Sequence, residues 1–174
     1  IHARGGGPVT VAEIDPAVTE IAIRDFWFDP ATARVLDEDA RVALARHPET
    51  YDVIVGDAFT DIAVPQHLIT REFYELVDTR LNPGGSYLMN VIDFEDRLEV
   101  LGAVTRSLQE VFPVVEIWTE AAQPQPGQRM VFVVVAGDSR TPIAGFQTRS
   151  PDPISFAALS DEMVAQIAGT GTLI

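Results

Sequence analysis

The sequence contains no cysteine and only three histidines, and these absences limit the chemistry it can perform. Without cysteine, a disulfide, a thiolate nucleophile and a Cys-ligated zinc site are all excluded. The histidines, His2, His47 and His67, lie far apart in the chain and have no metal-binding spacing. We therefore expect no metal centre in this protein.

Basic residues are also scarce. The 12 basic residues are all arginine and stand against 26 acidic residues, which gives a formal net charge of −14. Contacts with phosphate groups need Lys and Arg side chains, so the composition argues against a nucleic-acid partner. The acidity suits a cationic substrate such as an amine or polyamine, but a solvated acidic surface that aids solubility has the same composition.

Long apolar runs are missing as well. The longest run, residues 130–137, has the length of a strand and falls short of the roughly 20 residues that a membrane-spanning helix needs. With 174 residues and 47% hydrophobic content, the sequence predicts one globular domain over residues 1–174. The chain starts at Ile1 without a signal pattern and already in mid-fold, so we expect a fragment truncated at its N-terminus.

Segments with strand and helix character alternate along the chain. Predicted strands cover residues 9–15, 34–39, 51–59, 86–92, 114–118 and 130–136, and predicted helices cover residues 16–25, 40–46, 70–81, 95–112 and 156–168. The last two strands are joined without a helix, which predicts an antiparallel pair. This order indicates an α/β protein with a Rossmann-like methyltransferase fold, in which a mostly parallel sheet has an antiparallel strand near its edge.

Several helix boundaries carry local signals. Asp15 followed by Pro16 is typical of an N-cap and a first helical position. Thr70 has the same capping character, and the turn sequence at residues 82–85 is expected to end the helix that Thr70 begins.

The strand at residues 51–59 delivers a carboxylate to its own C-terminal end. Its run Val53-Ile54-Val55 is apolar and β-branched, as expected for a strand covered on both faces. Ligands of open α/β sheets bind outside the carboxyl ends of the strands, so Asp57 is a candidate site residue. The alternative is that Asp57 only caps the loop that follows.

Acids follow three successive predicted strands, at Glu13, Asp39 and Asp57. A carboxylate after the second strand of a Rossmann unit accepts hydrogen bonds from ribose hydroxyls, and Glu13 fits that role. Asp39 with the backbone of Ala40 could hold an adenine amino group, which leaves Asp57 near the reacting end of an adenosine-type ligand. Alternatively, Glu13 and Asp15 merely favour a helix start, and the acids near Asp39 form a solvated loop.

The chain resembles the spermidine synthase (polyamine aminopropyltransferase) superfamily over residues 9–137. The resemblance is carried by Val11–Pro16, Asp39–Arg41, Tyr51–Asp57, Leu68–Tyr74 and Leu81–Gly85. The Asp57 strand together with Thr70-Arg71-Glu72-Phe73-Tyr74 is its most specific part. The chain looks closest to a branch found fused to, or associated with, bacterial membrane transporter-like segments.

This resemblance implies transfer of an aminopropyl group from decarboxylated S-adenosylmethionine to putrescine or a related amine, with release of methylthioadenosine. In the family, the acid matching Glu13 holds the ribose, the acid matching Asp39 lies by the adenine, and the acid matching Asp57 helps take the proton from the attacking amine. Asp15 and Ala40 complete the donor site expected here. Asp61 is the expected second acid of the catalytic loop, displaced by one residue from its usual position in the family.

The altered loop keeps two alternatives open. One is an S-adenosylmethionine-dependent methyltransferase in which Asp57 and Asp61 position another nucleophile. The other is a non-catalytic nucleoside-binding homologue. The resemblance also predicts a homodimer in the cytoplasm, either free or as the cytoplasmic domain of a protein tethered to the membrane through segments outside this chain.

Overall fold

The computed structural model describes residues 6–59, 64–122 and 124–174. The chain divides between Pro48 and Glu49 into two compact units. The prediction of one domain over residues 1–174 stays a prediction. Among the residues described, no helix reaches the length and apolar character that crossing a lipid bilayer requires.

The first unit is built on a pair of short parallel strands, β1 (Thr10–Ala12) and β2 (Arg34–Leu36). The helix α1 (Pro16–Asp25) and the 3₁₀ turn η2 (Pro30–Thr32) connect them, and α2 (Ala40–Arg46) follows β2. Both strands end earlier than predicted, because the acidic residues after them belong to the turns and caps that begin the helices.

The structure confirms the predicted start of α1. The Oδ1 atom of Asp15 accepts a hydrogen bond from the backbone N–H of Ala17, and Pro16 occupies the first helical position. Because Pro has no N–H, it removes a donor that the first turn of a helix would otherwise leave unpaired.

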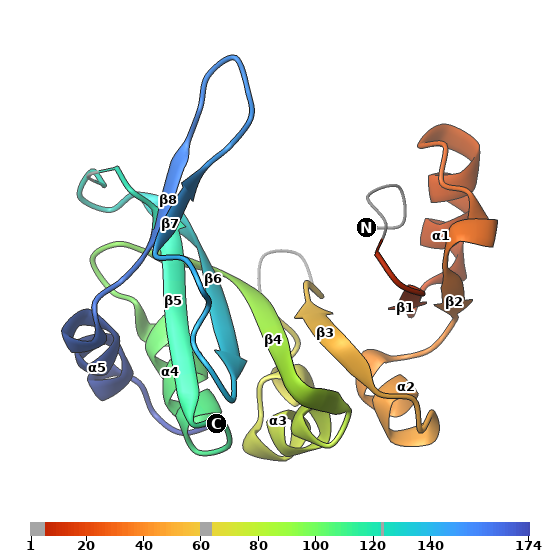
Figure 1. Ribbon diagram of the computed structural model, residues 1–174, viewed down its shortest axis with the longest axis horizontal. Coiled ribbons are helices and arrows are strands. Elements are labelled where there is room, and N and C mark those ends of the chain that lie inside the picture. The colour runs from red at the N-terminus through yellow and green to blue at the C-terminus, as the bar shows by residue number, and fades with distance from the viewer. Residues whose placement is uncertain (1–5, 60–63, 123) are drawn as a thin grey trace. The chain divides into compact units, whose positions relative to one another are not determined.

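The second unit holds a six-stranded sheet with three α-helices (Figure 1). Its elements are β3 (Tyr51–Gly56), η3 (Gln66–Leu68), α3 (Arg71–Asp78), β4 (Leu81–Phe94), α4 (Glu99–Gln109), β5 (Val114–Glu120), β6 (Arg129–Gly137), β7 (Gly145–Gln147), β8 (Ser155–Ala158) and α5 (Asp161–Thr170). The strand order is β3-β4-β6-β5-β8-β7. β3 and β4 are parallel, and the predicted antiparallel pairing of β5 with β6 is confirmed. β4, β5 and β7 run in the direction of β3, whereas β6 and β8 run the other way.

The two faces of β4 differ in burial. Tyr87, Met89 and Val91 are buried on the face against which α3 and α4 pack, whereas the alternate residues are only partly buried. Val53 and Val55 of β3 lie on this second face and are 53% and 59% exposed. Within the second unit, α3 and α4 pack on the opposite face of the sheet. The prediction that β3 is covered on both faces stays a prediction.

The turn sequence at residues 82–85 lies within β4 and does not directly end a helix. α3 already ends at Asp78, three residues earlier than predicted. The pairing of β3 with β4 passes from Tyr51 opposite Leu81 to Val53 opposite Ser86, so the turn residues form an irregularity in the ladder. Gly84 has a φ of 77°, which is a left-handed conformation that glycine adopts without steric cost.

The start of α4 also differs from the prediction. The helix begins at Glu99 and not at residue 95, because Leu98 adopts a left-handed conformation with a φ of 52°. The buried carboxylate of Asp93 accepts the N–H of Leu101 at 2.9 Å. This bond satisfies a donor in the first turn of α4 and ties the helix to the end of β4.

The C-terminal region contains a hairpin that the sequence did not predict. Residues 156–158, predicted as the start of a helix, belong to β8, and β6 is therefore not the last strand. Phe156 of β8 stacks on Phe146 of β7 with ring centroids 5.3 Å apart. α5 begins only after Ser160, whose hydroxyl accepts the N–H of Met163.

Two tyrosines are buried together between α3 and β4. Tyr74 and Tyr87 are 0% and 1% exposed, and their ring centroids lie 5.9 Å apart. Burial raises the pKa of both phenols well above the ordinary value, and the neighbouring Tyr87 adds to the shift at Tyr74.

We predict that alkali destabilises this core. The folded state holds both phenol protons more tightly than the unfolded state. The free energy of unfolding therefore keeps its full value below the unfolded pKa of about 10 and falls as the pH rises above it. The free energy of unfolding falls by at most about 1.4 kcal/mol per pH unit for each tyrosine. Urea denaturation between about pH 8 and pH 11 measures this loss. Tyr74→Phe should roughly halve the slope, and an unchanged slope in that variant would contradict the prediction.

Candidate functional site

Glu13 and Asp39 follow neighbouring parallel strands in the first unit. β1 and β2 are in register with Ala12 opposite Leu36, and the N–H of Glu13 donates to the carbonyl of Leu36 at 3.0 Å. The residues that follow the two strands therefore leave the same edge of the sheet, where ligands of α/β proteins bind.

A local hydrogen bond orients the Glu13 side chain. Its Oε1 atom accepts the backbone N–H of Asp15 at 2.9 Å, while Asp15 uses its own carboxylate to cap α1. The capping role weighed for Asp15 is thus confirmed. One oxygen of Glu13 is held by the backbone, and the second oxygen is the one that could contact a ligand.

Asp39 is the N-cap of α2. Its Oδ1 atom accepts the N–H groups of Arg41 and Val42 at 2.9 and 3.0 Å. Ala40 is the first residue of the helix, and the N–H groups of a first turn have no partner within their own helix. A carboxylate offers about four acceptor positions on two oxygens, so a capping role does not by itself exclude a ligand contact.

Asp57 follows directly after β3 in the second unit, and it has a partner that the sequence analysis missed. Its Oδ1 atom accepts a hydrogen bond from Nδ2 of Asn90 at 3.1 Å. Asn90 stands on β4 beside Met89, which pairs with Gly56. The available signal was an amide side chain in the middle of the predicted strand at residues 86–92.

The remaining site predictions stay predictions. Asp61, the expected second acid of the Asp57 loop, lies outside the described residues. Asp57 belongs to the second unit, whereas Glu13 and Asp39 belong to the first. Whether all three acids line one crevice therefore stays a prediction.

Gly56 allows the end of β3 to pack closely on the core. A Cβ atom at this position would overlap the hydroxyl of Tyr87 and approach its ring to 3.1 Å. Tyr87 is buried on the β4 face that carries Met89, so the absence of a side chain at Gly56 is what admits the ring. This contact lies immediately before Asp57 and therefore fixes the backbone that carries the acid.

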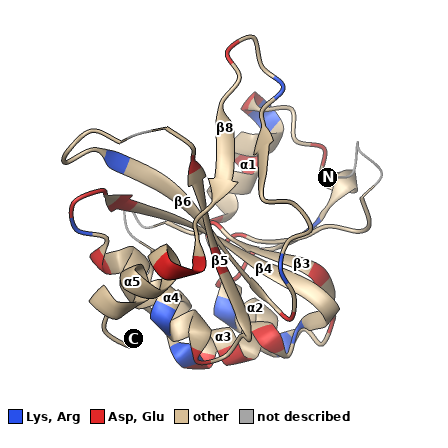
Figure 2. Ribbon diagram, turned by 60° about the vertical axis from the view of Figure 1, so that its left-hand side comes forward, with Lys and Arg blue, Asp and Glu red and all other residues tan. Residues whose placement is uncertain are grey.

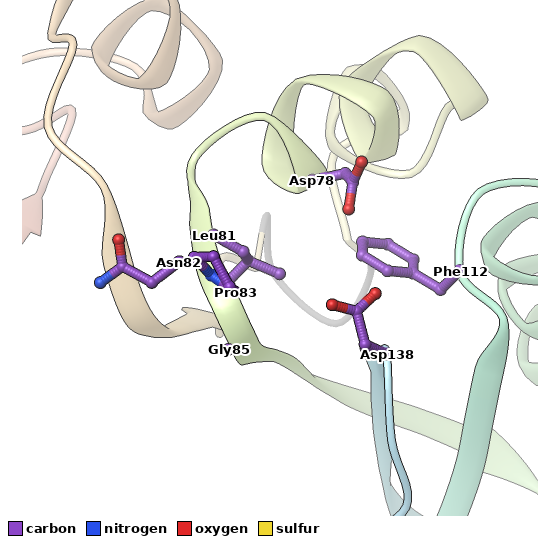
Figure 3. Close-up of a pocket in the computed structure, with 8 residues that line it drawn as sticks. Asp78, Leu81, Asn82, Pro83, Gly85, Phe112 and Asp138 are labelled. Atoms are coloured by element: carbon purple, nitrogen blue, oxygen red, sulfur yellow. The ribbon is translucent and has the colours of Figure 1, made fainter.

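A separate cavity of about 220 Å³ lies at the opposite end of β4 (Figure 3). Its lining residues are Asp78, Leu81, Asn82, Pro83, Gly85, Phe112, Gly137 and Asp138. Figure 3 shows Asp78 and Asp138 on either side of the Phe112 ring. Because Leu81 pairs with the first residue of β3, this cavity is at the other end of the strand from Asp57.

Negative charge is not confined to the candidate site. Figure 2 shows acidic residues on the helices and loops of the second unit, with arginines interspersed on α3 and α4. On α3, Arg71 pairs with Glu75 at 2.9 Å, and both side chains are exposed. Across the described ranges, no group of three or more His, Asp or Glu side chains is placed to hold a metal ion.

Comparison with known proteins identifies similar sequences. The profile of the spermine/spermidine synthase domain matches residues 8–143. A polyamine aminopropyltransferase of Vibrio vulnificus is 36% identical over 102 residues, which are 56% of this chain and 34% of that protein. An N-terminal histidine N-methyltransferase of Emericella nidulans is 32% identical over 136 residues, or 75% of this chain and 24% of that protein. The chain spans half or less of the length of the curated relatives it matches.

Solved structures confirm the Rossmann-like fold. The crystal structure of a probable spermidine synthase from Corynebacterium glutamicum matches with a TM-score of 0.77 and 21% identity, covering 95% of this chain and 62% of that one. Human methyltransferase-like protein 13 in complex with SAH matches with a TM-score of 0.60 and 19% identity, covering 94% and 68% of the two chains.

We predict that Gly56→Ala destabilises the second unit by about 1–3 kcal/mol, because the new methyl group forces Tyr87 or β3 to shift. Tyr87→Phe removes the overlapping hydroxyl, so the two substitutions should show a coupling energy in a double-mutant cycle measured by urea denaturation. Gly169→Ala in α5 is the matched control, since a Cβ there meets open space. That control should be neutral or slightly stabilising. If Gly56→Ala lowers the free energy of unfolding equally in the wild type and in the Tyr87→Phe variant, the proposed overlap is contradicted.

Proposed function

Because the chain belongs to the spermine/spermidine synthase domain family, we propose that it transfers an aminopropyl group from decarboxylated S-adenosylmethionine to putrescine or a related small amine. The observation that carries this proposal is the position of Asp57 at the carboxyl end of β3, within the part of the chain that matches the family. The polyamine aminopropyltransferases among the similar proteins support the same reaction class.

Asp57 has the chemistry that the transfer requires. An ammonium group has no lone pair, so it must lose a proton before it can act as a nucleophile, and a carboxylate can both bind it and accept the proton. The amine nitrogen then forms a bond to the aminopropyl carbon while the bond from that carbon to the sulfonium sulfur breaks. Methylthioadenosine leaves with the electron pair, and the proton goes to Asp57.

Donor binding is assigned to the acids of the first unit. Glu13 would accept hydrogen bonds from the ribose hydroxyls through the oxygen that Asp15 does not hold. Asp39 and the N–H of Ala40 would hold the adenine edge, and Asp15 would orient Glu13 and start α1. No metal takes part in this proposal.

The proposed acceptor site is built on the acids that follow β3 in the sequence. Asp61 would bind the amine together with Asp57, and the net charge of −14 favours a cationic acceptor. The homodimer, the cytoplasmic location and a tether to membrane segments outside this chain rest on the resemblance alone and stay predictions.

A methyltransferase is the second candidate. The similarity to the histidine N-methyltransferase over 75% of the chain favours it, because that protein's name also describes transfer to an amine-type nitrogen. In this reaction the donor would be S-adenosylmethionine, with Asp57 and Asp61 positioning the nucleophile. A non-catalytic nucleoside-binding homologue is the third outcome.

Calorimetric titration of the full-length protein separates the candidates. The ligands are decarboxylated S-adenosylmethionine, S-adenosylmethionine and methylthioadenosine. We expect preference for the decarboxylated donor together with turnover of putrescine. If the protein binds only S-adenosylmethionine, the aminopropyltransferase proposal is rejected and the methyltransferase is favoured. If it binds none of the three ligands, only a non-catalytic role is left.

A substitution at Asp57 tests its role as the base. Asp57→Asn keeps the size of the side chain but cannot take a proton, so we expect transfer at saturating amine to fall by about 10²–10⁴-fold. The affinity for methylthioadenosine should stay within about twofold of the wild-type value. Because a tenfold change in affinity corresponds to about 1.4 kcal/mol, a change of this size is small.

Asp52→Asn is the matched control for this test. Asp52 is an exposed acid near the other end of β3, and it also accepts a hydrogen bond from an asparagine of β4, Asn82, at 2.8 Å. The control should transfer at the wild-type rate. An Asp57→Asn variant that equals the control would show that Asp57 is not the base.

A further inference from the structure

A row of three side chains connects the start of β2 to the C-terminal end of α2. Nη2 of Arg34, the first residue of β2, lies 3.3 Å from Nδ1 of His47. Nε2 of the same imidazole lies 2.6 Å from Oε1 of Glu38. His47 is the residue that ends α2, and Glu38 lies in the turn before that helix. We call Arg34, His47 and Glu38 the His47 bridge.

The partners of His47 define the protonation state in which both contacts are hydrogen bonds. A guanidinium group only donates, so Nδ1 of His47 must accept from Arg34. An ionised carboxylate only accepts, so Nε2 must carry the proton that it donates to Glu38. The His47 bridge therefore requires a neutral imidazole with its proton on Nε2.

The His47 bridge is better shielded from solvent than the other ion pair of Glu38. The side chains of His47 and Glu38 are 25% and 17% exposed. Arg46 contacts the second carboxylate oxygen of Glu38 at 3.2 Å, but its side chain is 71% exposed. Exposed ion pairs contribute little, because solvent screens them and two long side chains lose entropy. The position of Glu38 therefore depends more on His47 than on Arg46.

Glu38 is bonded through its backbone to the segments that carry both predicted donor acids. The carbonyl oxygen of Leu36 accepts the N–H of Glu38 at 2.9 Å and the N–H of Glu13 at 3.0 Å. Asp39 follows Glu38 directly and caps α2. A displacement of Glu38 would therefore move the backbone at Asp39 and disturb the carbonyl group that also binds Glu13.

Stabilisation of α2 alone does not explain where the His47 bridge is attached. Asp39 caps the start of α2 with two hydrogen bonds, and the backbone N–H of His47 closes the last turn on the carbonyl of Ala43. Both ends of the helix thus have capping bonds without the imidazole. The imidazole instead fixes Glu38, which lies outside the helix in the turn that leads to Asp39.

We propose that His47 is a positioning residue of the donor site, which holds Glu38 in place and thereby fixes the turn that leads to Asp39. This inference rests on the proposed function, because it concerns the site for the adenosine part of the donor. In this role His47 touches no ligand. It restricts the turn before the donor arrives, which lowers the conformational entropy that binding costs.

Two substitutions of His47 in the full-length protein test this role. His47→Leu removes both side-chain contacts, whereas the amide of His47→Gln offers one acceptor and one donor, as the neutral imidazole does. Calorimetric titration with methylthioadenosine should show roughly tenfold weaker binding for His47→Leu and binding within about threefold of the wild type for His47→Gln. In the transfer assay, the KM for decarboxylated S-adenosylmethionine should rise by the same factor in His47→Leu, with kcat unchanged.

Arg46→Leu is the matched control, because it removes the other ion pair of Glu38 and leaves the His47 bridge intact. It should bind methylthioadenosine as the wild type does. A merely structural histidine would change the free energy of unfolding without changing the affinity of the folded protein. The positioning role is therefore overturned if His47→Leu binds with wild-type affinity, or if His47→Gln binds as weakly as His47→Leu.

A measurement on the wild-type protein covers the case in which His47→Leu does not fold. NMR of isotopically labelled imidazole nitrogens distinguishes the two neutral tautomers of His47. We expect the proton on Nε2, both in the free protein and with methylthioadenosine bound. A proton on Nδ1 would point at the guanidinium group of Arg34, so that tautomer would show that the His47 bridge does not form.

Failure of this inference can be told from failure of the proposed function. If the wild-type protein transfers aminopropyl groups but His47→Leu keeps the wild-type methylthioadenosine affinity and KM, the function stands and the role of His47 is overturned. If the wild-type protein binds methylthioadenosine but transfers nothing, while His47→Leu binds more weakly, the inference stands and the proposed reaction fails. If the wild-type protein binds no adenosine ligand, the donor site and the role of His47 fail together.

Discussion

The parallel pairing of β3 with β4 is the constraint on which the candidate acceptor site depends. Because Gly56 pairs with Met89, Asn90 comes beside Asp57 with a hydrogen bond of 3.1 Å. The irregularity at residues 82–85 sets this register, and a one-residue slip would turn Asn90 toward the buried face. Tyr87 packs against Gly56 at the same end of β3, on the face of the sheet that is buried in the core.

The acids of the first unit show that a structural role and a ligand role need not compete. Asp15 and Asp39 each use one carboxylate oxygen to begin a helix, and Glu13 is held by the N–H of Asp15. Such bonds restrict the side chains before any ligand arrives, which lowers the conformational entropy that binding would cost. The capping bonds are therefore compatible with the predicted donor site, which stays a prediction.

Local signals predicted the fold where the relevant interactions are local. The start of α1 at Asp15-Pro16 and the extent of α2 follow from capping residues within a few positions, and both are confirmed. The prediction was wrong at residues 156–158, which pair within β8 with β5 and β7 although their local sequence also suits a helix. Local sequence could not predict what covers Val53 and Val55 for a similar reason, because burial depends on which elements lie over a face.

The sequence by itself determined that acids follow three successive strands of an α/β chain, since strand periodicity, helix caps and turn residues are encoded within short segments. These local patterns are sufficient to place Glu13, Asp39 and Asp57 after predicted strands. Only the tertiary structure decided that Asp57 accepts a hydrogen bond from Asn90 and that the Asn90 carbonyl oxygen is buried with no partner in the described part of the chain. These two residues are 33 positions apart, and the register of a parallel strand pair, which no local pattern specifies, is what brings them together.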